Sequence, residues 1–217
     1  MNKDWSELNK TMQLQLKKKD TFAQGIGTLL GLRKELMTQI LKFREQLPVE
    51  AFSAMPFPNV KGYHSKSIAY SLWHIFRIED IVAHTLIAGD EQVFFTGEYQ
   101  GKIQAPIITT GNELEKEAIG EFSKQLQVDA LYEYIADVDK ATTEILTRLT
   151  YEDCKRKVSQ ERRQVLEELC VVSKEESACW LIDYWCGKDV RGLLQMPFSR
   201  HWIMHIEACR KIRDKVL

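Results

Sequence analysis

Histidine is the residue type whose spacing in this chain points most directly to chemistry. Only five histidines occur among 217 residues, and two of them, His201 and His205, are four positions apart. On a helix this spacing places both imidazoles on one face, one turn apart, where two ring nitrogens can reach one metal ion. The same face would carry Ala208, Ile212 and Val216, so both histidines are predicted to point into an apolar interior.

A third histidine, His74, has the same character. It would share a helical face with Tyr70 and Ile78, whereas His84 and His64 fall outside that face. Three inward imidazoles from two helices could hold a metal ion and leave it open coordination positions. The competing interpretation treats them as core histidines that are hydrogen-bonded to hydroxyls or carbonyls. On the residues alone the two interpretations are evenly matched.

Charged residues near these histidines are candidates for other roles. Arg77, one turn from His74, could meet an anionic group of a substrate, although an ion pair with a neighbouring carboxylate is favoured. Asp137 and Asp139 flank the apolar face of their helix and are expected to be solvated rather than to support metal ligands. Trp202 follows His201, so the HExxH pattern of zinc proteases is absent and no general base is identified.

Long helices must position these residues. Glycine and proline are few, at 11 and 5 residues, which disfavours folds built from many tight turns. Apolar periodicity predicts helices over 5–16, 21–47, 65–88 (ended by Gly89), 112–125, 129–149 (Asp129 as N-cap), 152–170, 174–186 (ended by Gly187) and from Pro197 to the end (Ser199 as N-cap). The expected fold is all-α: an up-and-down four-helix bundle with additional short helices and an irregular insertion, in a single domain over 1–217.

The irregular insertion is residues 89–111, which contain the apolar run Val93-Phe94-Phe95. A monomer would have to cover this run, so a homodimer is predicted. The alternative is that the segment folds back over its own bundle. Trp73 and Trp202, next to two of the histidines, are expected to pack between helices.

The composition of the chain argues against nucleic acid and membranes as partners. A net charge of −1 offers no general attraction to nucleic acid or to anionic membranes. Charged residues and histidines interrupt the most apolar stretch, 68–88, so no membrane span is expected. Five cysteines without a CxxC pair, at Cys154, Cys170, Cys179, Cys186 and Cys209, indicate free and mostly buried thiols in a reducing cytoplasm.

The segment Ser67-Ile-Ala-Tyr-Ser-Leu-Trp-His-Ile-Phe-Arg-Ile-Glu-Asp, together with the terminal pair His201-xxx-His205, resembles the DinB-like superfamily of four-helix bundles, including its YfiT-type members. The resemblance covers most of the chain, from the first long helix to the C-terminus. In that family one histidine of the second helix and two of the last bind a divalent metal, often zinc or nickel. These positions correspond to His74, His201 and His205. The inserted segments around 89–125 and 152–170 depart from the small family members and leave the substrate open.

The resemblance implies a metal-dependent enzyme that transfers a low-molecular-weight thiol to an electrophile or hydrolyses a small molecule. The alternative from a different class is a non-catalytic helical bundle with a structural metal, or one that binds a small ligand or a protein. A coordination position open to water would favour the enzyme, and a closed coordination shell would favour the alternative.

Overall fold

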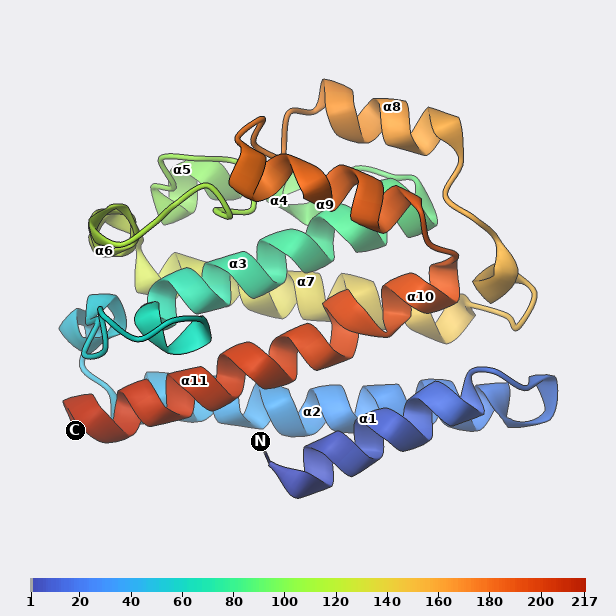
Figure 1. The fold of residues 1–217 in the computed structure, drawn as a ribbon, viewed down its shortest axis with the longest axis horizontal. Coiled ribbons are helices and arrows are strands. Elements are labelled where there is room, and N and C mark those ends of the chain that lie inside the picture. The colour runs from blue at the N-terminus through green and yellow to red at the C-terminus, as the bar shows by residue number, and fades with distance from the viewer. Residues whose placement is uncertain (1) are drawn as a thin grey trace.

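The protein is built from helices. The computed structural model describes residues 2–217, in which helices account for 73% of the chain and no strand forms. The four long helices are α2 (Phe22–Gln46), α3 (Ile68–Asp80), α7 (Val128–Arg148) and α11 (His201–Val216), and α1 (Lys3–Gln15) packs along α2 (Figure 1). The predicted all-α bundle with additional short helices is therefore confirmed. None of the described helices is long and apolar enough to cross a membrane.

Contacts between the helices fix their directions. The hydroxyls of Ser67, before α3, and Ser123, before α7, lie 2.6 Å apart, so both helices start at the same end of the bundle. Arg44, near the end of α2, pairs with Asp129 at the start of α7, so α2 runs in the opposite direction. α11 runs alongside α2 in the same sense (Figure 1). The long connection between α3 and α7 returns the chain to the end from which α3 starts, so α3 and α7 run in the same direction instead of alternating as in the predicted up-and-down bundle.

That connection is more regular than the sequence indicated. Residues 89–111, expected to be irregular, contain α4 (Val93–Thr96) and α5 (Tyr99–Ile103), and α6 (Glu117–Gln125) follows. Phe94 is completely buried in the main hydrophobic cluster, and Val93 and Phe95 pack against it. The apolar run is thus covered by its own chain, which removes the reason for which a homodimer was predicted. The dimer itself stays a prediction.

A second addition precedes the last helix. The charged stretch 152–170, expected to be one helix, is divided into a 3-10 turn (Asp153–Lys155) and α8 (Gln160–Glu168). α9 (Glu176–Cys186) and α10 (Val190–Leu194) follow, and α8 and α9 lie over the side of α3 that faces away from α1 (Figure 1). The thiols are less buried than expected: Cys154 and Cys209 are buried, whereas Cys170 and Cys179 are exposed.

Two predicted helix starts were wrong. Ser199 is not an N-cap, because α10 continues through a π-helical turn (Met196–Arg200) directly into α11. The Ser199 hydroxyl instead donates to the carbonyls of Leu194 and Gln195. α7 begins at Val128, which places Asp129 inside its first turn. There a carboxylate is favourable because it faces the positive end of the helix dipole.

A buried ion pair joins the bundle helices. The Arg33 guanidinium of α2 donates two hydrogen bonds of 2.7 Å to the Glu79 carboxylate of α3, and a third of 2.6 Å to Asp139 of α7. Arg33 also lies over the indole of Trp202 on α11, at 4.3 Å from the ring centroid. The side chains of Arg33 and Glu79 are 2% and 0% exposed. Asp139, expected to be solvated, is therefore a member of this cluster.

Replacing Glu79 by alanine should destabilise the protein strongly. The substitution leaves the Arg33 charge in the interior without its main partner, which typically costs about 3–5 kcal/mol. Asp129→Ala is the matched control, because it breaks another Arg–carboxylate pair of α2 at an exposed position, and should cost no more than about 1 kcal/mol. Urea unfolding followed by far-UV circular dichroism measures both. Equal losses of unfolding free energy would contradict a structural role for the buried pair.

Candidate metal centre

Three histidines meet between α3 and α11. His74 comes from α3, and His201 and His205 come from the first two turns of α11. One ring nitrogen from each lies within 4.8 Å of the others, and the residues are 6%, 6% and 2% exposed. Within residues 2–217 no other group of three His, Cys, Asp or Glu side chains is arranged in this way. The structure thus brings together the three histidines that the sequence singled out.

The backbone before α11 sets the direction of its two histidines. Pro197 has no N–H to donate, and its ring would clash with the carbonyl four residues earlier in a regular α-helix. The chain forms a wider π-helical turn over Met196–Arg200 and returns to α-helix at His201. Such turns shift the register of the side chains that follow them. The ring centroids of His201 and His205 lie 4.7 Å apart. The ring centroid of His74 lies 4.9 Å from that of His201 and 5.0 Å from that of His205.

His74 is oriented by a backbone carbonyl from the inserted segment. Its Nδ1 lies 2.7 Å from the Thr110 carbonyl oxygen. A carbonyl only accepts, so Nδ1 carries the proton and Nε2 keeps the free electron pair that a metal requires. Tyr70, one turn earlier, stacks on the His74 ring at 5.5 Å and 10°, and its hydroxyl donates to the Gly111 carbonyl at 2.9 Å. Gly111 has a φ of +78°, a conformation that favours glycine.

The other two histidines have nitrogens without partners. Nδ1 of His201 and both ring nitrogens of His205 are buried and have no hydrogen bond to any described residue. A buried polar atom that lacks a partner typically costs about 1–3 kcal/mol. A metal ion would take one nitrogen from each of the three rings as a ligand, so the residues present fit a divalent transition metal. An all-imidazole set suits zinc, nickel, copper and iron alike.

The protonation state of the site also suits a metal. Burial lowers the pKa of His74 to about 4, and the hydrogen bond from its Nδ1 to the Thr110 carbonyl opposes this shift only in part. Burial and the neighbouring imidazoles lower the pKa of His201 and of His205 well below the usual value. All three rings are therefore neutral at pH 7, which is the form that binds metal ions.

A cavity of about 450 Å³ adjoins the three imidazoles. Lys66, Tyr70 and Asn112 line it on the α3 side, and aromatic side chains of α9 line it opposite. The sequence analysis missed these residues. Spacing could have indicated Tyr70, which precedes His74 by four positions, but not Lys66, which lies in extended backbone before α3. No local pattern marks the α9 side chains or the Thr110 carbonyl, because tertiary packing alone brings them to the site.

The remaining candidates lie outside the centre. Nδ1 of His84 is 2.7 Å from an Asp90 carboxylate oxygen, so this histidine is bound to Asp90 and does not belong to the cluster. Arg77 is fully buried and pairs with Asp80 at 3.4 Å, as the favoured interpretation predicted. Asp137 accepts a hydrogen bond from the Tyr99 hydroxyl. Trp73 and Trp202 are fully buried, which confirms their packing role.

Comparison with known proteins gives no independent assignment. No protein-family model matches the chain, and no curated protein matches it. The finding that stands is an all-helical protein with a buried cluster of three histidines that could hold a metal ion. The geometry of that cluster and of its cavity carries the functional argument.

Metal affinity should change little in mildly acidic solution. Protons compete with a metal only below the pKa of the ligand, and burial has moved these values below their ordinary range. Three ordinary imidazoles would lose roughly 50-fold in apparent affinity between pH 7.5 and 6.0, whereas this site should lose less than about threefold. Competition titrations with a zinc-sensitive dye at both pH values measure this. A loss near the larger figure would show that the free imidazoles titrate as exposed groups.

Proposed function

We propose that this protein is a metal-dependent enzyme in which His74, His201 and His205 hold one divalent ion, zinc or nickel. A single observation carries the proposal: three neutral imidazoles, with one ring nitrogen of each within 4.8 Å of the others, lie on the wall of a cavity of about 450 Å³. Three protein ligands beside a cavity match the arrangement of catalytic sites, whereas structural sites are closed by four. The resemblance of residues 67–80 and of the His201–His205 pair to the DinB-like group supports the same function.

The reaction proposed is transfer of a low-molecular-weight thiol to an electrophile, or hydrolysis of a small substrate. A divalent ion on neutral ligands retains its full charge, so it can lower the pKa of a bound thiol or water and polarise a carbonyl group. The protein residues supply the setting for this chemistry. The Thr110 carbonyl fixes the ring of His74, and Tyr63 packs edge-on against His205 at 4.6 Å. Both contacts limit the movement of the ligands.

The alternative is a helical bundle without activity, in which the metal is structural or the cavity binds a ligand without converting it. The cavity beside the histidines favours the enzyme, because it leaves room for a substrate at the metal. Metal analysis combined with a search for turnover distinguishes the two classes. A bound metal without turnover in any thiol or hydrolytic reaction would support the alternative.

Replacing His205 by alanine should abolish tight metal binding and turnover together while the protein stays helical. Its ring is one of three ligands, and the hydrophobic clusters of the bundle do not depend on it. The test is elemental analysis of protein purified without an affinity tag and reloaded with zinc or nickel. Turnover is then screened with cysteine or glutathione and aryl halide or epoxide electrophiles, and with ester and amide substrates for hydrolysis.

His84→Ala is the matched control, because it removes a buried histidine of the same helical stretch that is engaged with Asp90. Wild type and this control should hold about one equivalent of metal, and His205→Ala less than roughly a tenth. Wild-type protein without metal, or His205→Ala that binds as tightly as wild type, would refute the metal assignment.

A further inference from the structure

The cavity beside the histidines has an unbalanced charge. Among residues 2–217, Lys66 is the only charged side chain that lines it, and no aspartate or glutamate does so. Its three imidazoles are neutral, for the reasons given above. The other lining residues are aromatic, aliphatic or small and polar. A divalent ion on the histidines would add positive charge that no carboxylate in the wall offsets.

Lys66 is held close to the histidines without an ion-pair partner. It is half-buried, and no carboxylate oxygen of residues 2–217 lies within 4.0 Å of its ammonium group. Its Nζ lies 5.2 Å from the centroid of the Tyr70 ring, and Tyr70 in turn stacks on His74. Burial lowers the pKa of Lys66, and the more distant Glu115 acts in the opposite direction. A cation that is partly desolvated and unpaired is an attractive position for an anion.

The opposite wall of the cavity is apolar and partly open. Trp180 and Tyr184 of α9 pack against each other with ring centroids 5.6 Å apart, and they remain 49% and 37% exposed. Leu181 and Trp185 of the same helix are buried and also line the cavity. Exposed aromatic side chains at the edge of a pocket provide contact area for an apolar ligand.

We propose that the cavity binds a small molecule in which an apolar body carries a carboxylate. The carboxylate pairs with Lys66, and the apolar body packs on the wall formed by Trp180 and Tyr184. This inference rests on the proposed function, since it takes the cavity as the substrate site, and it names the substrate class. The proposal places the anionic group of the substrate at Lys66, beside His74, and the apolar body against α9.

The test uses three probes and the full-length protein, both metal-free and loaded with zinc. 4-Phenylbutyrate combines an aromatic body with a carboxylate, 4-phenylbutyramide is its neutral analogue, and acetate lacks the body. Isothermal titration calorimetry measures the affinity of each. Metal-free wild type should bind phenylbutyrate at least about tenfold more tightly than either of the other probes. Because no metal is present in this arm, the preference for the carboxylate cannot come from metal coordination.

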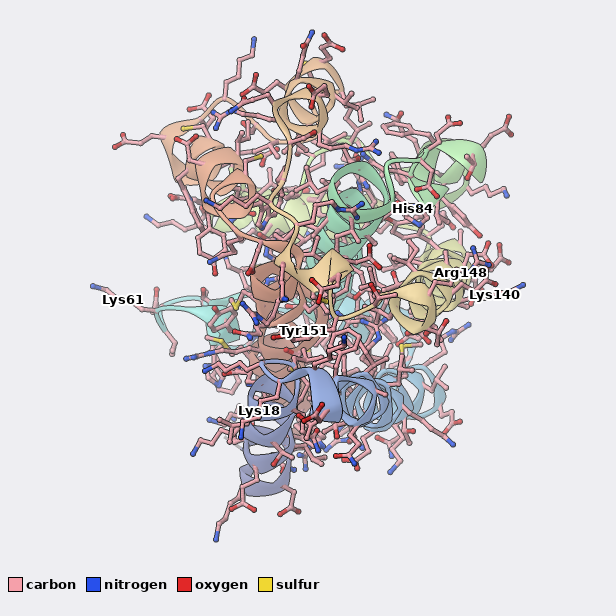
Figure 2. All side chains as sticks on the ribbon, turned by 90° about the vertical axis from the view of Figure 1, so that its right-hand side faces the viewer. Lys18, Lys61, His84, Lys140, Arg148 and Tyr151 are labelled. Atoms are coloured by element: carbon pink, nitrogen blue, oxygen red, sulfur yellow. The ribbon has the colours of Figure 1, made fainter. Side chains whose placement is uncertain are left out.

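Variants assign the preference to residues. In Lys66→Met the affinities for phenylbutyrate and its amide should differ by no more than about twofold. Trp180→Ala should weaken both aromatic probes by a similar factor, since it removes apolar contact and no charge. Lys61→Met is the matched control, because this nearby lysine is exposed and points away from the molecule (Figure 2). It should bind all three probes as wild type does.

Two outcomes overturn the proposal: equal binding of phenylbutyrate and its amide by wild type, or a Lys66→Met variant that keeps the wild-type preference. Acetate binding as tightly as phenylbutyrate would refute the apolar part. Zinc binding is measured on the same samples. A Lys66-dependent preference in protein that takes up no zinc when zinc is supplied would refute the metal-dependent function and leave this inference standing. Zinc binding without the preference would refute this inference and leave the metal-dependent function standing.

Discussion

The physical constraint on which this structure depends is the crowding of three buried, neutral imidazoles beside one cavity. Their ring nitrogens approach within 4.8 Å, and three of those nitrogens have no hydrogen-bond partner among residues 2–217. Free electron pairs and N–H groups that are removed from water without a partner lower stability. A cluster of this kind is explained if the nitrogens have a partner of their own, and a divalent metal is the partner that accepts several imidazoles at once.

Two buried charged residues of α3 maintain this arrangement. Asp80 accepts hydrogen bonds from the backbone N–H groups of Val93 and Phe94, each at 2.9 Å, and so holds the start of α4 against α3. Arg77 donates to the carbonyl of Ile108 at 2.9 and 3.0 Å, and so holds the other end of the inserted segment. Two residues further along, the Thr110 carbonyl orients His74. The long insertion is thus tied to α3 at both ends, and it delivers the group that determines which nitrogen of His74 is free.

The histidine cluster could be predicted from the sequence because it follows from helical periodicity. His201 and His205 are one turn apart, and His74 shares its face with apolar residues, so each had to point inward once the helices were recognised. The direction of α7 relative to α3 and the role of Thr110 could not be predicted, since both depend on how residues 89–127 fold back. Ser199 was assigned to a helix start because the preceding Pro197 is a common helix-start signal. Here Pro197 instead widens a helix that had already begun.

The residues that line the cavity beside the histidines could not be predicted from local sequence patterns either. The wall formed by Trp180 and Tyr184 lies more than 100 positions from His74, and a helix with exposed aromatic residues has no particular signature in a sequence. Lys66 lies in extended backbone just before α3, and only the cavity shows that it faces a space without a carboxylate among the lining residues. The sequence therefore predicted the histidine cluster, and the structure was needed for the surroundings that determine what it could bind.

The most direct test is a crystal structure of the zinc-loaded protein with diffraction recorded at the zinc absorption edge. The account predicts one anomalous peak bonded to His74, His201 and His205 at about 2.0–2.1 Å. At least one further coordination position should face the cavity and be occupied by water or solute. No peak at the three histidines, or a fourth protein ligand that closes the site, would contradict it.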